Sequence, residues 1–214
     1  MKIKIMILAL STALFACQSP VKQRSTPADP DSSSASSPAE NKTATDGEFD
    51  TSKIPVSDKE LGKFPYLHLP QDYTFGYDKE IKATDINNAD KEYFAVKGKL
   101  IPLEGKTYKA TLEKDRSKDN TRFSSLVAGK ALEKEIIGLG GVNVNNIPVP
   151  KSEIERVGDT ELITNKHGHS IDYNMLDDIK TYIIKTKDKE VWIQYLLMNE
   201  ESGIITVLEK SITQ

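Results

Sequence analysis

The chain of 214 residues has few of the residues that catalytic and metal sites use, with one cysteine, Cys17, and three histidines. A single cysteine excludes an intramolecular disulfide, a Cys-x-x-Cys redox motif and a thiolate metal cluster. The sequence lacks the Gly-x-Ser-x-Gly motif of serine hydrolases and the His-Glu-x-x-His motif of zinc proteases. Its Gly138–Gly141 segment follows an expected helix instead of preceding one, so it cannot present helix-start amides to a phosphate. We therefore predict no catalytic residue, no metal and no cofactor, and a protein that is not an enzyme.

An excess of positive charge is also missing, because 29 Lys and Arg stand against 32 Asp and Glu, for a formal net charge of -3. Nucleic-acid recognition needs a concentrated basic face, so this balance argues against a nucleic-acid partner. Long apolar runs are missing too, since only residues 5–16 approach the roughly 20 apolar residues that a membrane-spanning helix needs. With 37% hydrophobic residues and a mean hydropathy of -0.47, the remainder is typical of a soluble, globular domain.

The first sixteen residues have the three parts of a secretory signal: basic Lys2 and Lys4, the apolar stretch 5–16, and a small residue, Ala16, at its end. Within it, Leu14-Phe15-Ala16-Cys17 resembles the lipobox of bacterial lipoprotein signals, although the bulky Phe15 departs from that pattern. The resemblance implies thioether diacylation of Cys17, cleavage before it and acylation of the new amino end.

The alternative is an ordinary signal peptide with a chance cysteine near its cleavage site. Lipidation explains more, because it removes an unpaired thiol from an exported protein. Each buried methylene contributes about 0.8 kcal/mol, so one acyl chain binds a membrane marginally, whereas two or three hold it stably. Aspartate after the cysteine would resemble an inner-membrane retention signal. Gln18 stands there instead, which predicts the outer membrane, with the protein facing the periplasm.

Residues 18–58 are rich in Ser, Pro, Thr, Ala and Asp, and their few apolar residues have no period. Such a segment buries too little surface to offset the entropy of ordering, so we expect the lipidated Cys17 to be followed by a disordered linker that ends near residue 58. A flexible coil of about 40 residues has an end-to-end distance near 35 Å and extends to roughly 130 Å at most. The tether would let a domain stand clear of the bilayer.

A folded domain is expected over 60–214, where aromatic and branched residues begin to alternate with polar ones. Alternation and turn residues predict strands, and a broad apolar stripe with glycines behind it predicts a helix. The expected strands are 64–70, 73–77, 92–115 with a hairpin corner at Pro102–Gly105, and 142–149. The expected helices are 121–139, capped by Asn120 or Thr121, and a short one at 151–156.

The C-terminal third has the clearest pattern, with apolar runs at 179–186, 190–198 and 203–210 separated by short polar connections. Connections of this length predict an antiparallel meander. Trp192, the only tryptophan, is expected in or near the core because apolar Val191 and Ile193 flank it. We therefore predict an α+β domain with a mainly antiparallel sheet and one long helix.

An aromatic cluster precedes the first long strand, and it holds five of the fourteen Phe and Tyr residues within fourteen positions. Its members are Phe64, Tyr66, Tyr73, Phe75 and Tyr77. Rings on one exposed face could stack on a sugar or a flat ligand. Alternatively, the same rings close an edge of the core, a position that suits amphipathic tyrosine.

His167-Gly168-His169 places two imidazoles on one side of an extended segment, and Asp172 or Asp177 would add the third ligand of a minimal zinc site. The alternative is a polar turn with solvated histidines, which the surrounding Asn, Lys and Ser residues favour. We prefer the turn.

Several short motifs between residues 60 and 210 are similar to an uncharacterised envelope domain that often precedes an OmpA-like peptidoglycan-binding domain in Gram-negative outer-membrane proteins. The motifs are Phe64-Pro65-Tyr66, Leu69-Pro70, Tyr93-Phe94, Gly98, Pro102-Leu103-Glu104-Gly105-Lys106, Ser170-Ile171-Asp172-Tyr173, Tyr182-Ile183-Ile184 and Val191-Trp192-Ile193-Gln194. No segment carries the Asn-x-x-Leu-Ser-x-x-Arg helix of the OmpA-like domain itself. The resemblance therefore implies an envelope location and supplies neither peptidoglycan binding nor catalytic residues.

These patterns together predict a lipoprotein anchored in the outer membrane through Cys17, with a non-catalytic periplasmic domain that binds an envelope protein or a glycan such as peptidoglycan. Two alternatives stay open. One is an envelope hydrolase with a dispersed site that uses His167, His169 and an aspartate. The other is a small-ligand binding protein that uses the aromatic cluster.

Overall fold

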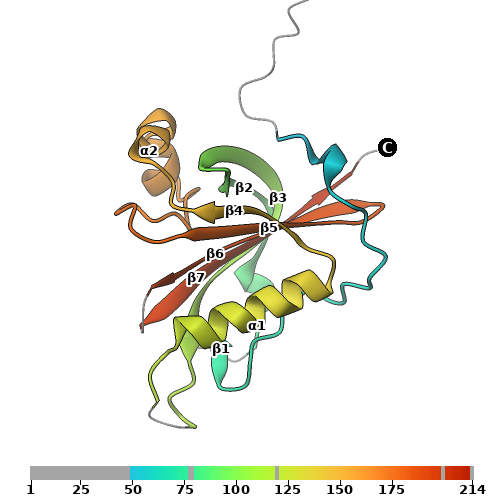
Figure 1. Cartoon of the computed structure of the whole chain (residues 1–214), viewed down its shortest axis with the longest axis vertical. Helices are drawn as coiled ribbons and strands as arrows, with labels where there is room; N and C mark the ends of the chain where they lie inside the picture. Colours follow the sequence, from blue (N-terminus) through green and yellow to red (C-terminus); the bar gives the residue numbers. More distant parts are fainter. Residues whose placement is uncertain (1–48, 77–79, 119–120, 199–200, 213–214) are drawn as a thin grey trace, which may run out of the picture. The chain divides into compact units, whose positions relative to one another are not determined.

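The computed structural model describes residues 49–76, 80–118, 121–198 and 201–212, and these residues form an α+β fold around one antiparallel sheet (Figure 1). The predictions for Cys17, for the signal and for most of the linker lie outside the described residues, as does Tyr77. The predicted fold class is confirmed, and so is the C-terminal meander, in which β5, β6 and β7 pair in sequence.

In the described residues the sheet has seven strands, in the order β1-β3-β7-β6-β5-β4, and β2 also pairs with β3. The strands are β1 (Tyr73–Phe75), β2 (Ile86–Val96), β3 (Lys99–Lys114), β4 (Val142–Ile147), β5 (Ile179–Lys185), β6 (Lys189–Met198) and β7 (Ser202–Ser211). The helices are α1 (Ser125–Gly138) and α2 (Lys151–Val157), with short turns η1 (Thr51–Lys53), η2 (Ala83–Asp85) and η3 (Thr160–Thr164).

The hairpin between β2 and β3 turns at Lys97–Gly98, so the predicted corner at Pro102–Gly105 is wrong. Both turn residues have positive φ, 50° and 78°, which is the geometry of a tight two-residue hairpin. Pro102 pairs with Tyr93 inside the ladder, and it breaks no bond because the Tyr93 amide points away from β3, to the carbonyl of His167. At Gly105 a Cβ would lie 2.3 Å from the carbonyl oxygen of Glu209, so only glycine lets β3 approach β7 here.

Helix α1 begins later than the sequence predicts, at Ser125, with Ser124 as the N-cap that accepts from the Val127 amide. The preceding Phe123 is buried against the Tyr73 ring, and this packing keeps residues 121–123 out of the helix. Three side chains that share one face of α1, Ala128, Leu132 and Ile136, are fully buried against the sheet. The helix thus covers one face of the sheet (Figure 1).

The other face of the sheet carries a second core around Trp192, which is 1% exposed, as the sequence predicts. The rings of Phe94 and Phe49 meet it edge to face at 5.8 and 6.1 Å. Ile54 is buried in the same cluster, and the Thr51 hydroxyl donates to the Glu190 carboxylate. The packed chain therefore starts at least ten residues before the expected boundary near Glu60, because isolated apolar residues in a polar stretch give no periodic signal.

The outer edge of β2 is closed by groups from several elements, because β2 packs near β4, β5 and β6. The Tyr93 amide donates to the His167 carbonyl, the Ala95 amide to Gln194 Oε1 at 2.6 Å, and the Lys97 amide to the Val144 carbonyl at 3.2 Å. We call this row of bonds the closed edge. It satisfies the amides that a buried strand edge cannot leave unpaired.

Candidate functional site

The aromatic cluster does not form one exposed face. Phe64, Tyr66 and Tyr73 are buried, with 6%, 5% and 9% of their surface exposed, and Phe75 is half-buried. The rings meet edge to face in pairs, Phe64 with Tyr66, Tyr73 with Phe123, and Phe75 with Tyr108, at centroid distances of 5.5, 5.4 and 5.6 Å. Three of the four described rings therefore close an edge of the core, as the second interpretation holds.

The segment 64–70 is not the strand that its alternation predicts. Residues 64–67 are all buried instead of alternating between two faces, and Tyr66 adopts a positive φ of 72°. A turn bond runs from the Tyr66 amide to the Lys63 carbonyl at 2.8 Å. The chain therefore turns at Phe64 and Pro65, and its side chains follow the curve of the core edge.

A groove of about 690 Å³ lies beside these rings, between the segment 63–69 on one side and the segment 80–86 on the other. Its lining is mostly apolar, and we call it the aromatic groove. It is lined by Lys63, Phe64, Pro65, Leu67, His68, Leu69, Tyr73, Thr74, Phe75, Glu80, Ile81, Ala83 and Ile86. The sequence prediction identified three of these residues, Phe64, Tyr73 and Phe75, whereas Tyr66 does not line the groove.

The wall of the groove formed by 63–69 is fastened to α1. The backbone amide and the Nδ1 atom of His68 both lie within hydrogen-bond distance of Glu135 Oε1, at 2.9 and 2.8 Å. The Lys106 ammonium lies 4.2 Å from the centroid of the Phe64 ring, a cation–π contact that also fixes this wall.

Tyr66 fastens the same wall to the sheet, because its hydroxyl donates to the Glu209 carboxylate on β7. Burial raises the pKa of Glu209. The Lys189 ammonium lies 3.3 Å from Glu209 Oε2 and 3.4 Å from the Tyr66 hydroxyl. Together with the contacts to α1, these bonds hold one wall of the groove in place before any ligand arrives, which reduces the entropy cost of binding.

The chemistry that the groove offers is contact with apolar and aromatic groups. Leu69, Phe75, Ile81 and Ile86 stay partly exposed in it, its charged residues are Lys63 and Glu80, and His68 adds an imidazole. Its volume lies within the range of about 300 to 1,000 Å³ that ligand sites span.

A buried ion-pair cluster forms a second candidate site on β2 and β3. Glu92 is fully buried, and its Oε2 lies 2.5 Å from the Lys109 ammonium, which also contacts Asp90 Oδ2 at 3.0 Å and the Lys166 carbonyl at 3.0 Å. Thr107 donates to Asp90 at 2.7 Å. Lys109 therefore has an oxygen for each of its three protons, which makes the cluster a structural one.

The pKa values of the cluster reflect burial opposed by charge. Burial raises the pKa of Glu92, although the hydrogen bond and charge of Lys109 act against it. Burial also disfavours the charged forms of Lys109 and Asp90, but for these two groups the hydrogen bonds and opposite charges of their partners outweigh burial. The pKa of Lys109 is raised by Glu92 and Asp90, and the pKa of Asp90 is lowered by Thr107 and Lys109. The cluster holds opposite charges together in a poorly hydrated place.

The structure separates the two histidines of the hypothetical metal site. The His169 amide donates to Glu92 Oε1 at 2.7 Å, and its ring Nε2 lies 3.4 Å from the Ala110 carbonyl. Burial lowers the pKa of His169, which keeps the ring neutral at pH 7. The His167 ring lies 3.2 Å from Glu161, whose carboxylate also pairs with Lys91 at 2.7 Å.

One of the two expected aspartate ligands, Asp172, is engaged elsewhere. The Asp172 carboxylate accepts the amides of Asn174, Leu176 and Asp177 at 2.7 to 2.9 Å, an arrangement that stabilises a turn. Within the ranges that the structure describes, no three His, Cys, Asp or Glu side chains are grouped so that they could hold a metal ion. The prediction of a polar turn with solvated histidines is wrong in its second part, because both histidines are half-buried.

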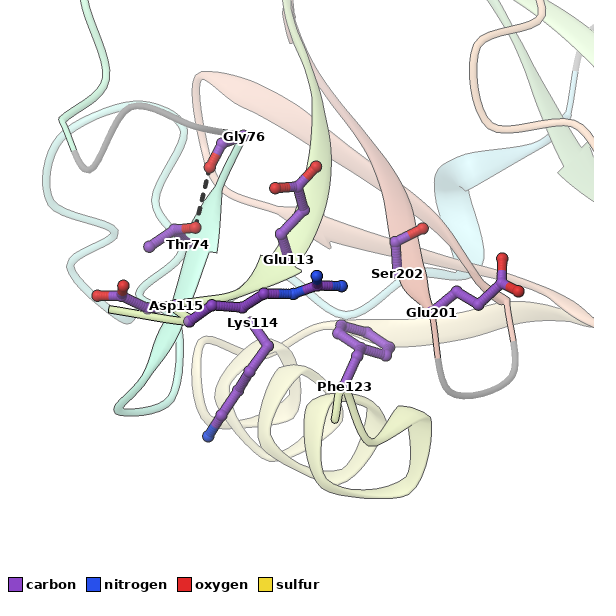
Figure 2. Close-up of a pocket in the computed structure, with 9 residues that line it drawn as sticks. Thr74, Gly76, Glu113, Lys114, Asp115, Phe123, Glu201 and Ser202 are labelled. Carbon is purple, nitrogen blue, oxygen red and sulfur yellow. Dashed lines mark hydrogen bonds between the residues drawn. The ribbon is translucent and has the colours of Figure 1, made fainter. Parts of the chain in front are cut away.

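A second hollow, of about 350 Å³, lies where β1 and the end of β3 meet the segment before α1 and the start of β7 (Figure 2). The Thr74 hydroxyl donates to the Gly76 carbonyl at its rim, at 2.9 Å. Figure 2 shows the charged ends of Glu113, Lys114 and Asp115 pointing in different directions. These three charged ends therefore do not converge on one point.

Sequence reasoning missed both the second wall of the groove and the ion-pair cluster. Ile81 and Ile86 have no periodic partners in the sequence, so nothing there marked them as a wall. The cluster did leave a signal, since Asp90 and Glu92 stand two apart in a strand and therefore share a face. The expected strand began only at residue 92, which hid that spacing.

In the part of the chain that the structure describes, no helix has the length and apolar character needed to cross a membrane. Comparison of the chain with protein-family models, with curated proteins and with solved structures finds no match.

Proposed function

We propose that this protein is a non-catalytic binding protein of the bacterial envelope, anchored in the outer membrane by lipid on Cys17 and facing the periplasm. In this proposal the residues after Cys17 form a tether, and the folded domain holds an extended segment of an envelope protein in the aromatic groove. The lipobox-like Leu14–Cys17 sequence supports the anchor. The similarity of residues 60–210 to an envelope domain supports the location.

The aromatic groove is the observation that carries the binding function. It is lined by the segments 63–69 and 80–86 and by β1, and the segment 63–69 is bonded to both α1 and β7. An extended peptide lying between such walls buries apolar side chains against Leu69, Phe75 and Ile81, and each Å² of apolar surface removed from water contributes about 25 cal/mol. Proline-rich or aromatic peptides use aromatic-lined grooves in this way.

The anchor is tested by lipid labelling of the full chain in a bacterial host. Labelled palmitate should be incorporated into the wild-type protein and not into the Cys17→Ala variant, and globomycin should block processing of the wild type. A Gln18→Ala variant serves as the matched control and should still be labelled. Label that persists in Cys17→Ala would refute the lipid anchor.

The groove is tested by placing a photo-crosslinking amino acid at Leu69 or Ile81 in the anchored protein. Leu176, which is 81% exposed and does not line the groove, is the control position. We expect the groove positions, and not position 176, to yield the same crosslinked envelope protein. Crosslinks to muropeptides would contradict a protein partner in favour of a glycan, and equal yields at 69 and 176 would contradict the groove.

The volume of the groove also favours a second candidate function, the binding of a small apolar ligand. About 690 Å³ would accommodate a drug-sized molecule or part of an acyl chain. Native mass spectrometry of the protein purified from cells distinguishes this function, because a bound molecule adds a discrete mass that disappears on denaturation. A single apo mass in every preparation would argue against it.

A further inference from the structure

Helix α1 carries apolar surface on the side that faces away from the sheet. Leu126, Val127 and Ile137 are 64%, 50% and 55% exposed, and they make up three of the eight large exposed hydrophobic residues in the described chain. Figure 1 shows α1 at the outside of the fold, over one face of the sheet. The helix therefore has one apolar side buried in its own domain and part of another left uncovered.

Four residues form a line along one flank of the helix, at spacings of four, three and four: Leu126, Lys130, Glu133 and Ile137. Leu126, Lys130 and Ile137 are exposed, whereas Glu133 is half-buried. Residues at these spacings share one side of an α-helix. The two apolar side chains lie at the ends of the line, and the opposite charges lie between them. Glu133 lies at the edge of this line nearest the sheet, where the hydroxyl of the buried Tyr182 donates to its carboxylate at 3.2 Å.

This line is complementary to itself. If two copies of α1 lie side by side and antiparallel, a two-fold axis near Ala131 places Leu126 of one copy opposite Ile137 of the other. The same axis places Lys130 opposite Glu133, twice. A parallel arrangement would instead bring like charges together. Two-fold dimers need this property, in which residue i meets residue j and residue j meets residue i.

We propose that α1 is a self-association surface through which two copies of this protein pair antiparallel along Leu126, Lys130, Glu133 and Ile137. The charge complementarity selects a second copy of the chain as the occupant. Four side chains from each copy make a small contact compared with the roughly 1,200 Å² of a standard interface, so the free protein dimerises weakly. Anchoring two copies in one membrane would raise their effective concentration, a consequence that rests on the proposed lipid anchor, whereas the dimer itself does not.

Charge exchange tests the pairing in the mature chain with Cys17→Ala, which is free of lipid. Sedimentation equilibrium up to about 0.5 mM should show a concentration-dependent dimer, which Lys130→Glu and Glu133→Lys each weaken at least fivefold. The double variant Lys130→Glu/Glu133→Lys restores both ion pairs and should restore the dimer. Lys151→Glu, the same charge change at an exposed position on α2, is the control and should dimerise like the parent.

Three results would overturn the proposal. They are a parent chain that stays monomeric throughout, single variants that dimerise like the parent, and a double variant that does not recover. Far-UV circular dichroism of each variant separates lost pairing from lost folding. A failure of this test would not contradict the proposed binding in the aromatic groove, because that binding is tested at other positions.

A disulfide experiment fixes the direction of the helices, since the Cys17→Ala chain has no other cysteine. One preparation carries Leu126→Cys and another carries Ile137→Cys. When the two are mixed and oxidised, the 126–137 heterodimer should form faster than either homodimer. Faster 126–126 or 137–137 crosslinking would contradict the antiparallel arrangement.

Discussion

At the closed edge of β2 the buried polar groups bond to one another, whereas the aromatic groove leaves apolar side chains in contact with solvent. Gln194 shows the first situation, because its fully buried amide accepts from Ala95 and Thr181 and donates to the carbonyls of Tyr93 and Ser170. Leu69, Phe75 and Ile81 show the second. The two regions therefore differ in role. Polar groups whose hydrogen bonds are all made stabilise the fold, whereas exposed apolar groups can contact a partner.

The largest expected effect comes from removing the cation of the buried cluster. In Lys109→Met, Glu92 is left buried without its partner, which should lower the free energy of unfolding by about 3 to 5 kcal/mol. Urea unfolding measures this loss. The double variant Glu92→Leu/Lys109→Met removes both buried charges and should recover much of the stability. A double variant no more stable than the single one would show that Lys109 does not act through Glu92.

The same variant should also change the pH dependence of stability. Burial already raises the pKa of Glu92 above its unfolded value, and loss of Lys109 raises it further. The folded state then binds more protons than the unfolded state, so the stability of Lys109→Met rises as the pH falls from 7 to 5. Over this range the stability of Glu92→Leu/Lys109→Met should rise less.

The next effect in size concerns Gln194. Gln194→Leu removes four hydrogen bonds and leaves the Ala95 amide without its acceptor, which should cost about 2 to 3 kcal/mol in urea unfolding. Gln71→Leu makes the same change at an exposed loop position and should alter stability by less than about 0.5 kcal/mol. Similar losses in both variants would mean that closure of the β2 edge does not depend on this amide.

A substitution in the groove should behave in the opposite way. Ile81→Ser should change the free energy of unfolding by less than about 1 kcal/mol, because Ile81 is only partly buried. It should nevertheless reduce crosslinking from position 69 several-fold, since it removes apolar surface from the opposite wall. Full crosslinking in Ile81→Ser would place the binding surface elsewhere.

The smallest expected effect is that of Glu161, at the surface beside His167. The Lys91 ammonium, followed by His167, lowers the pKa of Glu161 to about 2. Its stabilising contribution is therefore present above an unfolded value near 4.5 and is lost as the pH falls from there toward 2. Glu161→Gln should be slightly less stable than the wild type at pH 7, and the difference should shrink below pH 4.5. A difference that does not depend on pH would indicate a packing effect.

The sequence by itself determined the features that depend on neighbours in the chain. Alternating apolar residues predicted β5, β6, β7 and their meander, and the stripe of Leu132 and Ile136 predicted α1. The flanking apolar residues placed Trp192 in the core. These signals are reliable because a strand or a helix imposes its own period on the side chains that it buries. The lipid anchor on Cys17 also depends on a local pattern, and it stays a prediction.

Only the tertiary structure decided the features that join distant segments. The hairpin turns at Lys97–Gly98, and Pro102 and Gly105 are accommodated inside the ladder. Pro102 lies opposite Tyr93, whose amide points away from β3, and Gly105 lies where β7 approaches closely. The aromatic rings were drawn into the core edge, and the groove between 63–69 and 80–86 arose from two loops that have no common pattern. Contacts of this kind depend on which surfaces the folded sheet brings together. The local hydrophobic period reflects only neighbours in the chain, so it does not predict these contacts.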